Sequence, residues 1–74
     1  MRLYSQKTCA PCNDLKTYLD KKGIRYTVRD IDEDPEYLSL LLKHTDGRLL
    51  VPTLTKGSKT VVGLNWRAIA ELIQ

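Results

Sequence analysis

The sequence contains no phenylalanine, one tryptophan, one histidine and two cysteines among its 74 residues. No apolar run approaches the roughly 20 residues needed to span a bilayer, and the N-terminus lacks the apolar segment of a signal peptide. There is also no low-complexity tract and no internal repeat, which argues against a disordered or solenoid chain. We therefore expect a soluble globular protein that works in the cytoplasm, away from membranes.

The length sets the size of the fold. Seventy-four residues predict one domain over residues 1–74, with no sequence left for a linker. A chain this short buries only about 60% of the surface that its unfolded form exposes. The core must therefore be small.

The net charge of +3 and the pI near 9.0 raise the question of a nucleic-acid partner. Basic and acidic stretches alternate, however, in the order Lys21, Lys22, Arg25 and Arg29, then Asp30, Asp32, Glu33 and Asp34. No stacking or groove-entering signature accompanies them. The charge pattern predicts a solvated mixed surface and no nucleic-acid binding.

The first half of the chain predicts a βαβ unit. Residues 2–5 are typical of a short strand, and a helix follows from Pro11, with Cys12, Leu15 and Leu19 on one stripe. Gly23 ends this helix. Residues 24–29 alternate apolar and polar side chains, which indicates a second strand, and the right-handed crossover makes the two strands parallel.

The second half adds one helix, a hairpin and a last helix. Asp34 and Pro35 suit the start of a helix, residues 51–55 and 59–62 predict a hairpin around Gly57, and Asn65 caps the last helix. Trp66 lies on the apolar stripe of that helix, which predicts a core position, and a place beside a ligand groove near Asn65 is the alternative. The order βαβαββα predicts an α/β protein whose four-stranded mixed sheet is flanked by three helices.

The two cysteines, Cys9 and Cys12, have three possible uses. A structural disulfide over so small a loop contributes about 2 kcal/mol and is disfavoured in a reducing compartment. A structural zinc site needs about four ligands, whereas the chain offers two cysteines and His44, which we expect on the surface at a helix end. No metal is therefore expected, and thiol-disulfide chemistry remains.

The position of Cys9 suits that chemistry. Its sulfur lies where a helix begins and faces unpaired amides and the positive end of the dipole, which favours the thiolate. Cys12, one turn further on, stays protonated until needed. Lys7 adds a positive charge and Pro11 stiffens the turn. Cys9 is thus the predicted nucleophile and Cys12 the resolving thiol.

Three segments together, "LYSQKTCAPC", "LLVPTL" and "VVGLN", resemble the glutaredoxins and glutaredoxin-like redoxins. The resemblance implies a thioredoxin-like fold and a cis Val51-Pro52 bond beside Cys9. It also implies that the Val51 backbone pairs with an extended substrate or glutathione. Tyr4 either lines the approach to Cys9, as the resemblance implies, or packs in the core from the first strand. Glutathione is then a co-substrate, no cofactor is bound, and the protein acts as a monomer that reduces protein or glutathione mixed disulfides.

The departures from the family pattern concern the electron donor. Gln6 stands where glutathione-using members often carry lysine, with Lys7 one step later. Gly63 and Asn65 replace a Gly-Gly pair and an acidic residue, although Asn65 and the helix amides suit a carboxylate. Gly63, Asn65 and Lys7 are therefore predicted to bind glutathione.

Three alternatives remain open. "GIRYTVRDIDEDPEY" is similar to redoxins that take electrons from thioredoxin reductase and serve ribonucleotide reductase, but their usual Phe-Arg-Pro-Asp segment is missing. An iron–sulfur cluster shared between two subunits is a second alternative, which Pro11 and Cys12 disfavour. The third is a non-catalytic binding module on a redox fold.

Overall fold

The computed structural model describes residues 1–74, and its elements follow the predicted order βαβαββα. The strands and helices are β1 (Arg2–Ser5), α1 (Ala10–Lys21), β2 (Thr27–Asp30), α2 (Pro35–His44), β3 (Thr53–Lys56), β4 (Lys59–Val62) and α3 (Trp66–Leu72). None of these helices is long and apolar enough to cross a membrane.

The four strands form one mixed sheet in the order β2-β1-β3-β4. β1 runs parallel to β2 and antiparallel to β3, and β3 runs antiparallel to β4. In this register Tyr4 lies opposite Thr53, and Thr53 lies opposite Val62. The end of β1, the start of β3 and the end of β4 therefore meet at one end of the sheet.

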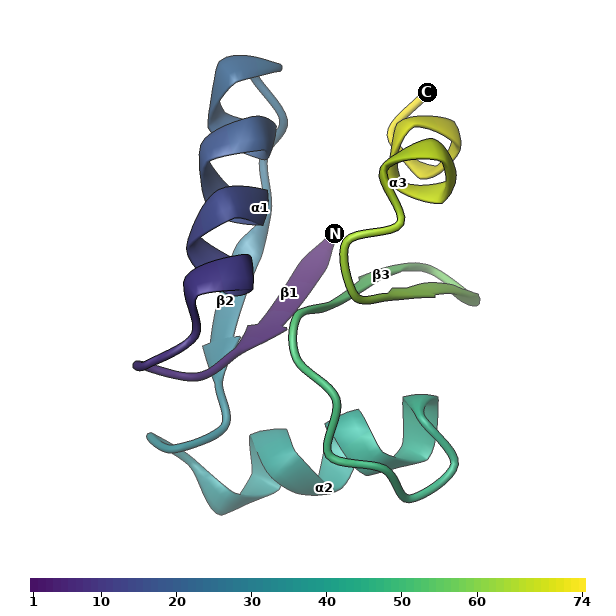
Figure 1. The fold of residues 1–74 in the computed structure, drawn as a ribbon. Coiled ribbons are helices and arrows are strands. Elements are labelled where there is room, and N and C mark those ends of the chain that lie inside the picture. The colour runs from purple at the N-terminus through teal and green to yellow at the C-terminus, as the bar shows by residue number, and fades with distance from the viewer.

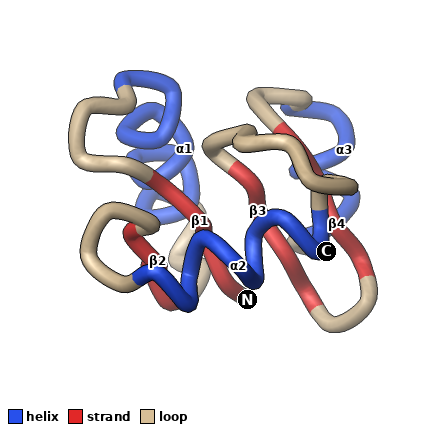
Figure 2. The backbone as a smooth tube through the Cα atoms, turned by 90° about the horizontal axis from the view of Figure 1, so that it is seen from below, coloured by secondary structure: helices blue, strands red, loops and turns tan.

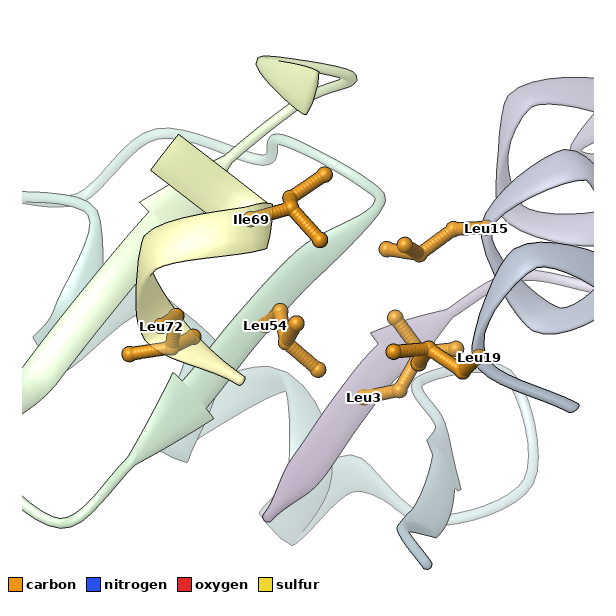
Figure 3. Close-up of a cluster of buried hydrophobic side chains, with 6 residues drawn as sticks. All are labelled: Leu3, Leu15, Leu19, Leu54, Ile69 and Leu72. Atoms are coloured by element: carbon orange, nitrogen blue, oxygen red, sulfur yellow. The ribbon is translucent and has the colours of Figure 1, made fainter. Parts of the chain in front are cut away.

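The helices cover both faces of the sheet, two on one side and one on the other. α1 and α3 lie on one face and α2 crosses the opposite face (Figures 1 and 2). The larger core cluster lies under α1 and α3 and consists of Leu3, Leu15, Leu19, Leu54, Ile69 and Leu72 (Figure 3). The smaller cluster, of Tyr4, Ile31 and Leu41, lies under α2. This arrangement confirms the predicted fold class.

Two strands begin later than predicted. β2 starts at Thr27, because the amide of Ile24 donates to the carbonyl of Leu19 at 3.0 Å and so closes the end of α1. β3 starts at Thr53, directly after a proline that has no N–H for a sheet ladder. Alternation of side chains shows which residues face the core, but not which amides reach a neighbouring strand.

The core position predicted for Trp66 is wrong. Its side chain is 41% exposed and packs against the ring of Tyr18, with the centroids 4.9 Å apart. Trp66 is the first residue of α3, so it lies at the margin of the covered face, whereas Ile69 is fully buried one turn later. His44, by contrast, lies exposed at the end of α2, as predicted.

Candidate redox site

Cys9 is the N-cap residue of α1. Its backbone is extended, with φ −113° and ψ 101°, and its Sγ accepts a hydrogen bond from the amide of Cys12 at 3.1 Å. No acidic residue lies in the first turn of α1. The sulfur thus meets an amide donor and the positive end of the helix, both of which favour a thiolate when the thiol is free.

Cys12 is fully buried and heads the stripe that Leu15 and Leu19 continue along α1. It is joined to Cys9 in a disulfide, with the two Cα atoms 5.2 Å apart, which is within the usual range for bridged cysteines. Cys9 retains 9% exposure. The two cysteines are therefore unequal: Cys12 is closed to solvent, whereas Cys9 keeps a small exposed area.

The predicted cis bond between Val51 and Pro52 is present in the structure. Pro52 precedes Thr53, so the strand register brings it to the end of the sheet from which β1 leads into the cysteine loop. Its carbonyl accepts a hydrogen bond from the amide of Gly63 at 2.8 Å. The segments around Cys9, Pro52 and Gly63 therefore gather at one end of the molecule.

The backbone of Val51 has free hydrogen-bonding capacity. Neither its N–H nor its carbonyl has a partner within the chain, while its half-buried side chain packs against the cluster under α2. An unpaired donor and acceptor on one residue are what an added extended strand requires. Substrate binding by Val51 remains a prediction, and this backbone is consistent with it.

Gly63 and Asn65 connect β4 to α3. Gly63 has φ +74°, a left-handed conformation that favours glycine. The side chain of Asn65 accepts a hydrogen bond from the Ala68 amide at 3.1 Å and so caps α3. Asn65 is exposed, but one of the helix amides is already occupied by its own side chain. Glutathione binding by these two residues remains a prediction.

Lys7 and Gln6 form the loop before Cys9. Lys7 is exposed and forms no ion pair, so its charge is free to act near Cys9. Gln6 donates from Nε2 to Asp32 Oδ1 at 3.5 Å, a contact between the cysteine loop and the β2–α2 loop that sequence reasoning missed. A pairing 26 residues apart in sequence leaves no local signal.

Tyr4 is not at the site surface. It is completely buried in the cluster under α2, with its ring 5.9 Å from that of His44 and beneath the guanidinium of Arg29 at 6.0 Å. The prediction that Tyr4 lines the approach to Cys9 is therefore wrong for its side chain. Alternation along β1 directs it to the face opposite α1.

Ser5 is a further residue at this end that sequence reasoning missed. It is 1% exposed, and its Oγ is a buried side-chain atom without a hydrogen-bond partner. The alternation of Leu3, Tyr4 and Ser5 along the first strand was the available signal, because it places Ser5 on the α1 face. No group of three or more metal-ligating side chains gathers anywhere in the chain.

The helix-capping cysteine, its buried partner and the cis proline at the same sheet end define a thioredoxin-fold protein with a redox-type cysteine pair. Comparison with known proteins identifies the family within this class. The family model for glutaredoxin matches residues 2–61, and the chain belongs to the glutaredoxin family. A search of curated proteins returned no match.

Solved structures show the same fold. A glutaredoxin from Archaeoglobus fulgidus is 31% identical with a TM-score of 0.82, over 99% of this chain and 84% of that one. The thioredoxin-like protein BC3987 is 25% identical with a TM-score of 0.87, over 96% of both chains. A buckwheat glutaredoxin in complex with glutathione is 24% identical with a TM-score of 0.74, over 97% of this chain and 71% of that one.

Proposed function

We propose that this protein is a dithiol oxidoreductase that reduces protein disulfides or glutathione mixed disulfides and takes its electrons from glutathione. The observation that carries the proposal is the N-cap of α1, where the Cys9 sulfur accepts the Cys12 amide proton at 3.1 Å and is bridged to Cys12 itself. A structural cross-link does not need a position at a helix terminus.

The reaction begins from the reduced pair. The Cys9 thiolate attacks one sulfur of the substrate disulfide, so that a Cys9–substrate disulfide forms and the other substrate sulfur leaves as a thiolate and takes up a proton. Cys12 then loses its proton and attacks Cys9 Sγ, which releases the second substrate thiol and closes the Cys9–Cys12 disulfide. The substrate gains two electrons, and two glutathione thiols return them to the protein as one glutathione disulfide forms.

The Val51 backbone is the proposed docking strand. An extended substrate or the glutathione peptide donates to the free Val51 carbonyl and accepts from the free Val51 N–H. Because Pro52 follows directly and lies at the cysteine end of the sheet, this pairing holds the substrate disulfide near Cys9. Family membership supports glutathione as the donor, and the buckwheat protein is one glutaredoxin solved with glutathione.

The first test is reduction of the oxidised protein followed by NADPH consumption in two parallel assays. One contains glutathione and glutathione reductase, and the other contains thioredoxin reductase alone. We expect turnover in the first. Turnover only in the second would replace glutathione by thioredoxin reductase as donor, and turnover in neither would overturn the oxidoreductase proposal.

Two variants assign the roles of the sulfurs. Cys9→Ser should reduce turnover to the uncatalysed level, because no nucleophile remains at the helix start. Cys12→Ser should still attack but accumulate a mixed disulfide with glutathione, visible by mass spectrometry as a single adduct on Cys9. Native turnover no faster than that of Cys9→Ser would favour the non-catalytic binding module.

A further inference from the structure

A small polar cavity lies beside the sheet, at the end away from the cysteines. Its volume is about 240 Å³, and it is lined by Met1, Arg2, His44, Thr55 and Gly57. Arg2 is the first residue of β1, whereas the cysteine loop follows the last residue of that strand. The cavity is therefore separate from the redox site, and the proposed function makes no use of it.

The pairing of β1 with β3 brings two of the lining residues together on the α2 face. Arg2 lies opposite Thr55 in this register. Leu3 points into the core under α1 and α3, so Arg2, one residue earlier, is directed to the other face, and Thr55 shares that face. His44 comes from the last turn of α2, where its ring lies 5.9 Å from that of Tyr4.

The hydroxyl of Thr55 is the observation that points to a ligand. Thr55 is only 4% exposed, and its hydroxyl forms no hydrogen bond within the chain, whereas Thr53 on the same face donates to the Leu50 carbonyl at 2.7 Å. Ser5 Oγ is the only fully enclosed side-chain oxygen without a partner. The unpaired oxygen of Thr55 must therefore open into the cavity that Thr55 lines. Hydroxyls buried this deeply normally have a partner.

The other polar groups around the cavity are also donors. Arg2 presents a guanidinium without an ion pair, because the one ion pair of the chain joins Arg67 to Glu71. The Gly57 amide has no partner within the chain, and the His44 imidazole can donate from a ring nitrogen in either protonation state. No aspartate or glutamate lines the cavity. These groups together select a ligand that is negatively charged and rich in acceptors.

We propose that this cavity binds a phosphate group, either as free inorganic phosphate or as part of a small phosphorylated molecule. A phosphate group presents three strong acceptor oxygens and pairs well with the planar fork of an arginine. A carboxylate presents two oxygens in one plane, which suits donors arriving from two strands, a turn and a helix less well. The volume lies below the about 300 Å³ at which pockets for drug-sized ligands begin, so the ligand is small.

The second cavity of the protein lacks this character. It lies between β4 and α3, and Glu71 lines it together with Lys59, so charges of both signs meet there. An anion is therefore expected to prefer the cavity beside Arg2.

The test is a titration of the oxidised protein with inorganic phosphate, followed by the amide chemical shifts in NMR spectra. Sodium chloride at equal ionic strength corrects for general screening of charge. We expect saturable shifts confined to the amides around Arg2, His44, Thr55 and Gly57. The titration involves no disulfide exchange, so its outcome is independent of the proposed redox function.

Two pairs of variants locate the binding. Arg2→Gln should weaken phosphate binding by about tenfold or more, because it removes a charge-assisted hydrogen bond. Thr55→Val keeps the shape of the side chain without its hydroxyl and should weaken binding by about threefold to tenfold. Arg25→Gln is the control for charge, and Thr60→Val, opposite Thr55 on β4 but outside this cavity, is the control for the hydroxyl. Both controls should bind as the native protein does.

Three ligands distinguish the two sources of the phosphate group. Tighter binding of glycerol phosphate than of inorganic phosphate supports a phosphorylated small molecule, and equal binding supports free phosphate. Three outcomes overturn the proposal. They are shifts that chloride reproduces, acetate binding as tight as that of phosphate, and affinities in Arg2→Gln and Thr55→Val equal to those of their controls.

Discussion

At the scale of single residues, the N-terminal caps of the three helices differ in the side-chain atom that accepts the hydrogen bond. Asp34 caps α2 through a carboxylate oxygen that accepts the Glu36 amide at 2.9 Å, and Asn65 caps α3 through an amide oxygen. Cys9 caps α1 through sulfur. Sulfur is a weak acceptor as a thiol and a stronger one as a thiolate, so the cap of α1 improves when Cys9 becomes reactive.

Tyr4 gives a prediction that separates a core residue from a binding residue. Because Tyr4 is fully buried among Ile31 and Leu41, Tyr4→Ala should destabilise the fold by about 3–5 kcal/mol. Tyr4→Phe keeps the ring and should retain both stability and the Michaelis constant for the disulfide substrate. Urea unfolding and steady-state kinetics on the two variants provide the measurement.

The contradicting result for Tyr4 is kinetic. If Tyr4→Phe is as stable as the native protein but binds substrate several times more weakly, the Tyr4 hydroxyl contacts the ligand in solution. Leu41→Ala provides the control, because it removes a buried side chain of the same cluster that lies on α2, away from the cysteine loop.

The residues of the site differ in how well the sequence revealed them. Cys9 and Cys12 follow from local spacing and helix-start chemistry, and the cis Pro52 follows from the family resemblance. Tyr4, Trp66 and Ser5 depend on which face or edge of the sheet each side chain meets. That information is not local, because it arises only when β3 pairs with β1 and α3 packs beside α1.

At the scale of elements, hydrogen bonds join α1 to the segment that leads into β2. The Ile24 amide donates to the Leu19 carbonyl at 3.0 Å, and the Tyr26 hydroxyl donates to Asp20 Oδ1 at 2.9 Å. The first bond explains why β2 begins after residue 26 and not at residue 24. The order of the elements was predictable from periodicity and caps, whereas this boundary depends on a backbone contact between neighbouring elements.

The hydrogen bond between Tyr26 and Asp20 predicts that the stability of the fold depends on pH in the alkaline range. Burial raises the pKa of Tyr26 above its ordinary 10.0, and the hydrogen bond to Asp20 and its negative charge raise it further. A raised pKa means that the folded state holds the proton more tightly than the unfolded chain. The stabilisation that the protonated Tyr26 hydroxyl gives to the fold is therefore complete below pH 10.0. It is lost as pH rises through the raised pKa of Tyr26.

Tyr26→Phe is the variant that tests this dependence. It removes the ionisable group, so the difference in urea midpoint between native protein and variant should shrink as pH rises from about 7 to about 11. Tyr18→Phe controls for general tyrosine ionisation, because the Tyr18 hydroxyl donates to no carboxylate. A difference that stays constant across this range contradicts the assignment.

At the scale of the whole molecule, the redox chemistry and the core share one helix. α1 presents Cys9 and Cys12 at its start, and Leu15 and Leu19 of the same helix belong to the six-residue core cluster. In a core this small, any free energy that differs between the bridged and the open cysteine pair also appears in the stability of the whole domain.

This coupling predicts a small stability gap between the redox forms. A bridge between Cys9 and Cys12 closes so short a loop that chain entropy alone gives the oxidised form an advantage of about 2 kcal/mol. The reduced form gains a thiolate cap at α1, which the unfolded chain lacks and which offsets part of that advantage. Urea unfolding with and without dithiothreitol should therefore give a gap below about 2 kcal/mol.

The reduced form of Cys9→Ala identifies the source of the offset. Without the sulfur, α1 loses its cap, and the variant should be less stable than the reduced native protein by about 1 kcal/mol. Asp34→Ala, which removes the cap of α2, should cost a similar amount in both redox forms of the protein, because α2 holds neither cysteine. A gap well above 2 kcal/mol, together with a reduced Cys9→Ala as stable as the reduced native protein, would mean that Cys9 contributes nothing to the folded dithiol.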